Sequence, residues 1–74
     1  MKIGVIGAGS WGTALATVAA ANGHETCLWA YEPELVTGMA STGINTLYLP
    51  QIQLHQALRY TNDLTEASTD AELL

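Results

Sequence analysis

Three glycines near the amino end are spaced so that they could bind an anionic ligand. They lie in the run Gly7-Ala8-Gly9-Ser10-Trp11-Gly12, which follows an apolar stretch and precedes an alanine-rich one. A strand, a tight turn and a helix start in that order leave backbone N–H groups and the positive end of the helix dipole facing the turn. The first glycine permits the sharp turn, the second lets backbone approach phosphate oxygens, and the third lets helix and strand pack closely. The run therefore predicts the pyrophosphate site of a dinucleotide.

An acidic residue stands where this kind of site reads the adenosine ribose. Glu32 comes 20 positions after Gly12, at the expected tip of the second strand. A carboxylate there accepts a hydrogen bond from a free 2′-hydroxyl and repels a 2′-phosphate, which favours NAD over NADP. The alternative is that Glu32 only caps the following helix. Tyr31 beside it either lies against the adenine or is an ordinary exposed turn residue.

The other reactive residue types form no arrangement suited to catalysis or metal binding. Trp11 either walls the cofactor site or anchors the helix in the core, and we expect the second role. His24 and His55 are far apart and lack partners at metal-ligand spacing, so both are expected in loops. Cys27 lies in an apolar run with no activating neighbour, which predicts a buried strand thiol in a reducing compartment.

Hydrophobic patterning and turn signals indicate the elements that would position these residues. Strands are predicted at 3–6, 25–30 and 58–61, because short continuous apolar runs suit parallel strands covered on both faces. Helices are predicted at 10–22, from 32 to about 40, and at 64–68, each with a start or stop signal. Residues 45–53 are expected to form a loop. Residues 71–74 either begin a fourth strand or cap a helix.

These elements indicate an α/β fold, a partial Rossmann-type doubly wound parallel sheet. It would hold the first βαβ unit, a third strand and a fourth strand that only begins. The chain has 74 residues, 49% hydrophobic and 12% charged, with a net charge of −5. Two cations against seven acids argue against a nucleic-acid or anionic-membrane surface. No run approaches the about 20 apolar residues of a membrane span, so we expect a cytoplasmic protein.

Several stretches carry a more specific pattern than the glycines alone: Gly7 to Ala16, Asn22-Gly23-His24-Glu25, Leu28-Trp29-Ala30 with Pro33-Glu34-Leu35, and Asn45-Thr46-Leu47-Tyr48-Leu49-Pro50. Together they resemble the N-terminus of the bacterial NAD(P)-dependent glycerol-3-phosphate dehydrogenases. The resemblance implies hydride exchange between glycerol 3-phosphate and dihydroxyacetone phosphate for phospholipid synthesis. It also implies a set of cofactor-binding residues, with the pyrophosphate lined by Gly7, Gly9, Ser10, Trp11 and Gly12 and the adenosine end met by Tyr31 and Glu32. Many bacterial members carry Arg where Tyr31 stands, which again supports NAD.

The resemblance places the catalytic lysines and a helical substrate domain beyond Leu74. Residues 1–74 are therefore expected to be a partial dinucleotide-binding domain that is inactive alone, since Lys2 opens the first strand and is the only lysine. Without a complete fourth strand, the first strand is expected to keep an unpaired edge that favours aggregation or a homodimer. The alternatives are the cofactor domain of a ketopantoate reductase or sugar-nucleotide dehydrogenase, and a non-catalytic NAD-binding module.

Overall fold

A four-stranded parallel sheet forms the centre of the molecule, in the order β3-β2-β1-β4. The computed structural model describes all 74 residues. The strands are β1 (Lys2–Ile6), β2 (Glu25–Trp29), β3 (Arg59–Thr61) and β4 (Glu72–Leu73), and they alternate with the helices α1 (Ser10–Ala21), α2 (Pro33–Thr42) and α3 (Leu64–Ser68). The predicted α/β class, the parallel sheet and the order of its elements are confirmed.

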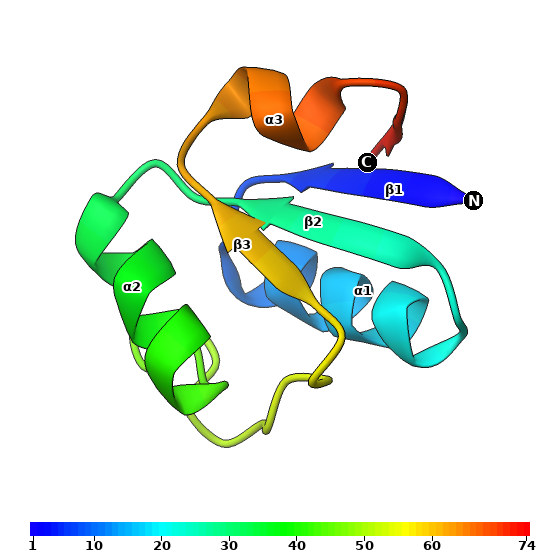
Figure 1. Cartoon of the computed structure of the whole chain (residues 1–74). Coiled ribbons are helices and arrows are strands. Elements are labelled where there is room, and N and C mark those ends of the chain that lie inside the picture. Colours follow the sequence, from blue (N-terminus) through cyan, green and yellow to red (C-terminus); the bar gives the residue numbers. More distant parts are fainter.

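Helices cover both faces of this sheet. Figure 1 shows α3 above the sheet and α1 and α2 below it. Gly4 faces α3 so closely that a Cβ there would meet the carbonyl oxygen of Ala67. The side chain of Val5 belongs to the main buried cluster, which also contains Leu28 and Met39. The small residues of α1 (Thr13, Ala16, Ala19 and Ala20) are its buried ones, so α1 can lie close to the strands.

The signals that end and begin helices act as the sequence indicates. Helix α1 is followed by Gly23, whose φ of 88° is a left-handed conformation that glycine adopts without steric cost. Helix α2 runs two residues past its expected end and stops at Gly43, which has a φ of 71°. Asp63 caps α3, because its carboxylate accepts hydrogen bonds from the N–H groups of Thr65 and Glu66.

The carboxyl end of the chain corrects one expectation. Residues 72–73 form β4, so the strand interpretation of residues 71–74 is confirmed over the helix cap. Strand β4 pairs with β1 through Ile3–Glu72 and Gly4–Leu73. The expectation that β1 keeps an unpaired edge is therefore wrong, because even two residues of β4 cover the middle of that edge. The homodimer expected from this edge loses its basis at β1.

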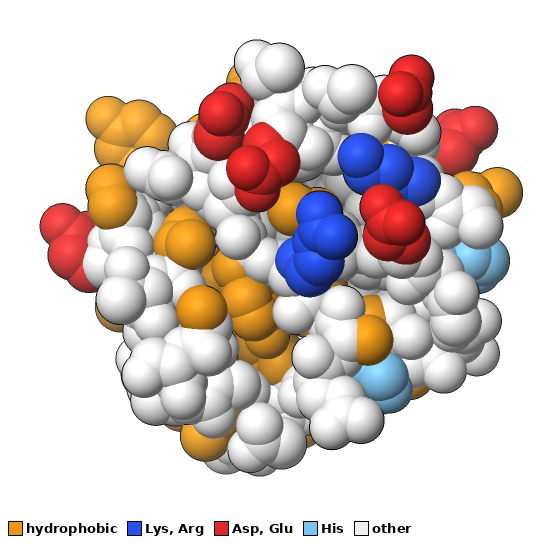
Figure 2. All heavy atoms as spheres, viewed as in Figure 1, with side chains coloured by type: hydrophobic (Ala, Val, Ile, Leu, Met, Phe, Trp, Pro, Cys, Tyr) orange, Lys and Arg blue, Asp and Glu red, His pale blue; other side chains and the backbone are white.

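The two cations of the chain lie close to acidic side chains, and its one cysteine is buried. Figure 2 shows the two cationic side chains, Lys2 and Arg59, on one face among acidic ones. Cys27 is a free, buried thiol, as predicted, and burial raises its pKa above the ordinary value, with a smaller contribution from Glu66. None of the three helices has the length and apolar character needed to cross a bilayer.

Candidate functional site

In the turn between β1 and α1, the backbone geometry explains why two of the three positions, Gly7 and Gly12, are glycine. Gly7 has a φ of 111°, and its N–H donates to the carbonyl oxygen of Trp29 at 3.0 Å, which ties the turn to the end of β2. A Cβ at Gly12 would meet the carbonyl oxygen of Gly7. Only glycine therefore lets α1 start this close to β1. Gly9 differs, since a Cβ there would meet no atom within 4 Å. Its backbone faces open space.

The same turn presents a row of unpaired backbone donors. The first N–H of α1 with an acceptor inside the protein is that of Thr13, which donates to Gly9, and the N–H groups of residues 8–12 have none. Gly9 is the N-cap residue and no side chain caps the helix; its first turn contains no acid. Helix starts left in this state bind anions, because the free N–H groups and the helix dipole point the same way.

The exit of β2 lies beside this turn and carries the predicted adenosine residues. Tyr31 is 78% exposed and its ring makes an edge contact with Trp29, with centroids 6.4 Å apart. Glu32 occupies the N-cap position of α2, yet its side chain makes no capping hydrogen bond. Its carboxylate accepts instead from the hydroxyl of Tyr48 at 3.3 Å. Glu32 therefore holds the N-cap position through its backbone, while its side chain does not cap α2.

Two residues of the loop after α2, Asn45 and Tyr48, join this site, and the sequence predicts no role for either of them. Asn45 is fully buried and its amide donates to the carbonyl of Ala8 and to the hydroxyl of Thr13, both at 2.8 Å. Its side-chain oxygen accepts from the N–H of Tyr48 at 3.0 Å. The role of Asn45 could have been suspected from its type and place, because Asn side chains in loops often accept a hydrogen bond from a backbone N–H a few residues later.

Ser10 and Trp11 differ from their simplest expected roles. The hydroxyl of Ser10 donates to the carbonyl oxygen of Tyr48, so in this structure it holds the loop and leaves the N–H of Ser10 to face the site. Trp11 is 82% exposed. The expectation that Trp11 anchors α1 in the core is therefore wrong.

Charge near the turn is acidic rather than basic. Lys2 lies at the opposite end of β1, where its ammonium donates to the carbonyl oxygen of Thr69 at 2.8 Å. The negative charge of Glu32 and the hydrogen bond to it raise the pKa of the Tyr48 hydroxyl. No group of three or more His, Cys, Asp or Glu side chains is placed to hold a metal ion. An anion at the turn would be held by backbone donors.

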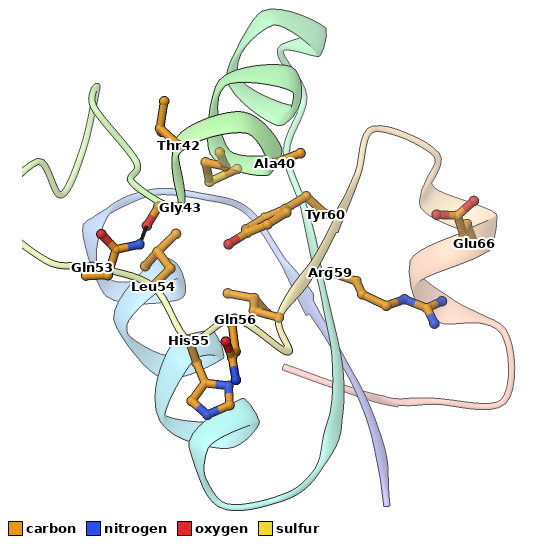
Figure 3. A pocket seen from close by; sticks show the side chains of 12 residues that line it. Ala40, Thr42, Gly43, Gln53, Leu54, His55, Gln56, Arg59, Tyr60 and Glu66 are labelled. Atoms are coloured by element: carbon orange, nitrogen blue, oxygen red, sulfur yellow. Dashed lines mark hydrogen bonds between the residues drawn. The ribbon is translucent and has the colours of Figure 1, made fainter.

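A groove lies away from this turn. It has a volume of about 570 Å³, runs between α2, the segment before β3, and β3 itself, and includes no predicted site residue. Figure 3 shows the ring of Tyr60 pointing into it, while Arg59 points away toward Glu66 on α3. The turn is the candidate cofactor site because it combines free backbone donors, an open backbone approach and a nearby carboxylate.

The residues at the turn fit a dinucleotide. Free N–H groups face open space at Gly9, which suits a pyrophosphate, and Glu32 at the next strand end suits a ribose diol. Both lie beyond the carboxyl ends of β1 and β2, which is where open parallel sheets bind their ligands. The arrangement has the donors and the acceptor that binding and orienting a dinucleotide would require.

Comparison with known proteins agrees with this geometry. Residues 2–74 match the family described as the N-terminus of NAD-dependent glycerol-3-phosphate dehydrogenase. All 74 residues align, at 72% identity, with a glycerol-3-phosphate dehydrogenase [NAD(P)+] of Trichlorobacter lovleyi. A counterpart from Geobacter sp. is 61% identical over 66 residues, or 89% of the chain. The chain spans 22% and 20% of the length of these two relatives.

Solved structures give the same result. The crystal structure of glycerol-3-phosphate dehydrogenase from Coxiella burnetii superposes with a TM-score of 0.85 and 40% identity, over 95% of this chain and 22% of that one. The enzyme from Saccharomyces cerevisiae superposes with a TM-score of 0.89 and 30% identity, over 99% of this chain and 25% of that one. The match decides between the dehydrogenase families considered from the sequence. The chain belongs to the glycerol-3-phosphate dehydrogenase family, and it corresponds to the family's NAD-binding N-terminal region.

Proposed function

We propose that this chain supplies the cofactor half of an enzyme that interconverts glycerol 3-phosphate and dihydroxyacetone phosphate. Residues 1–74 would form part of the dinucleotide-binding domain, and the substrate phosphate and the proton-transfer groups would be bound by other parts of the protein. The observation that carries this proposal is the row of unpaired N–H groups at residues 8–12, placed one strand away from Glu32. The chemistry proposed for the bound nicotinamide is to accept or return the hydride of the secondary alcohol.

The residues of this chain would act by binding and orientation. The backbone of Gly7, Gly9, Ser10 and Gly12 would hold the pyrophosphate, while Trp11 would close one side of it. Tyr31 would lie against the adenine and Glu32 would accept from the ribose hydroxyls. Because the position of a cofactor sets the distance over which hydride moves, this binding contributes to rate as well as to affinity.

NAD is the cofactor that the site favours over NADP. A 2′-phosphate would bring a second anion beside the Glu32 carboxylate, and the turn has no lysine or arginine to offset the repulsion. The unpaired, buried thiol of Cys27 also supports a reducing, cytoplasmic location for the enzyme.

The test is a titration of both cofactors by the protein at its full natural length. In the double variant Glu32→Ala with Tyr31→Arg, we expect the ratio of the NADP and NAD dissociation constants to fall by about tenfold or more, because repulsion is replaced by attraction. Glu34→Ala is the matched control, since it removes an exposed acid of the same helix that has no hydrogen-bond partner. An unchanged ratio in the double variant would contradict the proposed role of these two residues.

A further inference from the structure

The loop after α2 enters the cofactor site through one side chain, that of Tyr48. We propose that Tyr48 is a positioning residue that strengthens the preference for NAD, by holding the Glu32 carboxylate in place to receive the ribose. The proposal rests on the proposed function, since it assigns Tyr48 to the same cofactor site. Tyr48 would act through Glu32 and would touch no reacting atom.

Tyr48 is fixed on both sides of its backbone. Its N–H donates to Asn45 at 3.0 Å, and its carbonyl oxygen accepts from the hydroxyl of Ser10. Asn45 is in turn fixed, because its amide is buried and donates to Ala8 and Thr13. The backbone of Tyr48 is therefore bound to the same turn that would hold the pyrophosphate. These hydrogen bonds therefore fix the position from which the Tyr48 side chain extends.

The hydroxyl of Tyr48 reaches one oxygen of the Glu32 carboxylate and no other acceptor. The distance from the hydroxyl to Oε2 is 3.3 Å, and Oε1 has no hydrogen-bond partner in the protein. Each carboxylate oxygen has two acceptor sites, so a donor from Tyr48 leaves room for donors from a ribose diol. The hydrogen bond restricts a flexible glutamate before the cofactor arrives, which lowers the entropy that binding must overcome.

This restriction affects NAD and NADP differently. The ribose of NAD offers a 2′-hydroxyl that donates to the held carboxylate, so it gains from the correct orientation. A 2′-phosphate is repelled by that carboxylate, and a Glu32 free to turn away would repel it less. Loss of the Tyr48 hydroxyl is therefore expected to weaken NAD binding and to leave NADP binding unchanged or slightly improved.

The experiment is Tyr48→Phe in the protein at its full natural length, with dissociation constants for NADH and NADPH measured by fluorescence titration. We expect the constant for NADH to rise by about three- to tenfold, within the net range for one typical hydrogen bond, while that for NADPH changes less than about twofold. Tyr60→Phe is the matched control. It makes the same chemical change in a tyrosine whose hydroxyl makes no hydrogen bond and which lines the groove beside β3.

A double-variant cycle separates positioning from a general effect on folding. In a Glu32→Ala background, Tyr48→Phe should no longer change NADH affinity, because the group it positions is gone. Equal weakening of NADH and NADPH, an effect that persists without Glu32, or unchanged NADH affinity in Tyr48→Phe would each overturn the role of Tyr48. Failure of the unaltered protein to bind either cofactor would overturn the proposed function itself, which is a distinguishable result.

Discussion

The turn at residues 7–12 and the segment at residues 44–58 meet at one site but are held in different ways. The turn depends on backbone geometry within six residues, with a positive φ at Gly7 and no room for a Cβ at Gly12. The segment has almost no regular structure, and side chains such as Asn45 fix it to distant parts of the chain. The comparison teaches that a cofactor site can combine a locally determined half with a half that exists only through tertiary contacts.

The largest expected effect breaks the turn. Gly12→Ala would place a Cβ against the carbonyl of Gly7, which is backbone and cannot turn aside, so the free energy of unfolding should fall by more than about 3 kcal/mol. Chemical denaturation measures this. Gly38→Ala is the matched control, because a Cβ at this position in the middle of α2 would meet no other atom within 4 Å. Alanine there should stabilise the helix by about 0.5–1 kcal/mol. Equal stabilities for the two variants would show that the close approach at Gly12 is not limiting.

The next variant breaks the segment. Asn45→Ala would remove one of the two donors to the carbonyl of Ala8 and leave the N–H of Tyr48 without its partner, and we expect a loss of about 2–3 kcal/mol, smaller than for Gly12→Ala. Asn62→Ala, at an exposed asparagine whose side chain has no hydrogen bond, should change stability by less than about 0.5 kcal/mol. If Asn45→Ala were as mild as Asn62→Ala, the segment would not depend on its buried amide.

A smaller effect sharpens the comparison at a second attachment point. The hydroxyl of Thr17 on α1 accepts from the N–H of His55 at 2.7 Å. Thr17→Val keeps the shape and removes this acceptor, so about 1 kcal/mol of unfolding free energy should be lost and amide exchange at His55 should accelerate. Thr65→Val, at an exposed threonine whose hydroxyl has no partner, serves as the control. Unchanged exchange at His55 in Thr17→Val would contradict the attachment.

The smallest effect concerns the sheet on which both regions rest. Burial raises the pKa of the Cys27 thiol above its ordinary value of 9.0. The neutral thiol is therefore the form that folding favours, and its contribution is fully present below pH 9 and is lost as pH rises toward the folded pKa. We expect a slight fall in unfolding free energy above pH 9, measured by denaturation at several pH values. Cys27→Ala should remove that part of the pH dependence, and an identical profile in both proteins would refute it.

The sequence predicts the first half of this architecture better than the second. Continuous apolar runs, the glycine spacing and Asn22-Gly23 act within a few residues of themselves, so strand, turn and helix were placed correctly from local patterns. The helix α3, expected at residues 64–68, was predicted for the same reason. The site residues taken from the glycine pattern remain predictions, although Gly7 and Gly12 have the backbone geometry that the pattern requires.

What the sequence did not predict depends on contacts between distant residues. Asn45 is buried because its amide bonds to Ala8 and Thr13, which are more than 30 positions away in the sequence. No hydrophobic periodicity around Asn45 predicts this. The exposure of Trp11 could not be inferred from its type, because a large aromatic at a helix start is as easily expected in the core. The expected open edge of β1 was wrong because the pairing of β4 with β1 joins residues about 70 positions apart, which local patterns do not reveal.

The long separation between Asn45 and its acceptor on Ala8 has a consequence for synthesis of the protein. These partners are 37 residues apart. The nascent unit of strand, turn and helix therefore leaves the ribosome well before the stabilising side-chain amide of Asn45 is available. During that interval the glycine loop lacks the hydrogen bond from the Asn45 amide to the carbonyl of Ala8. Competence to capture a nucleotide should therefore arise only after the polypeptide has emerged through Tyr48.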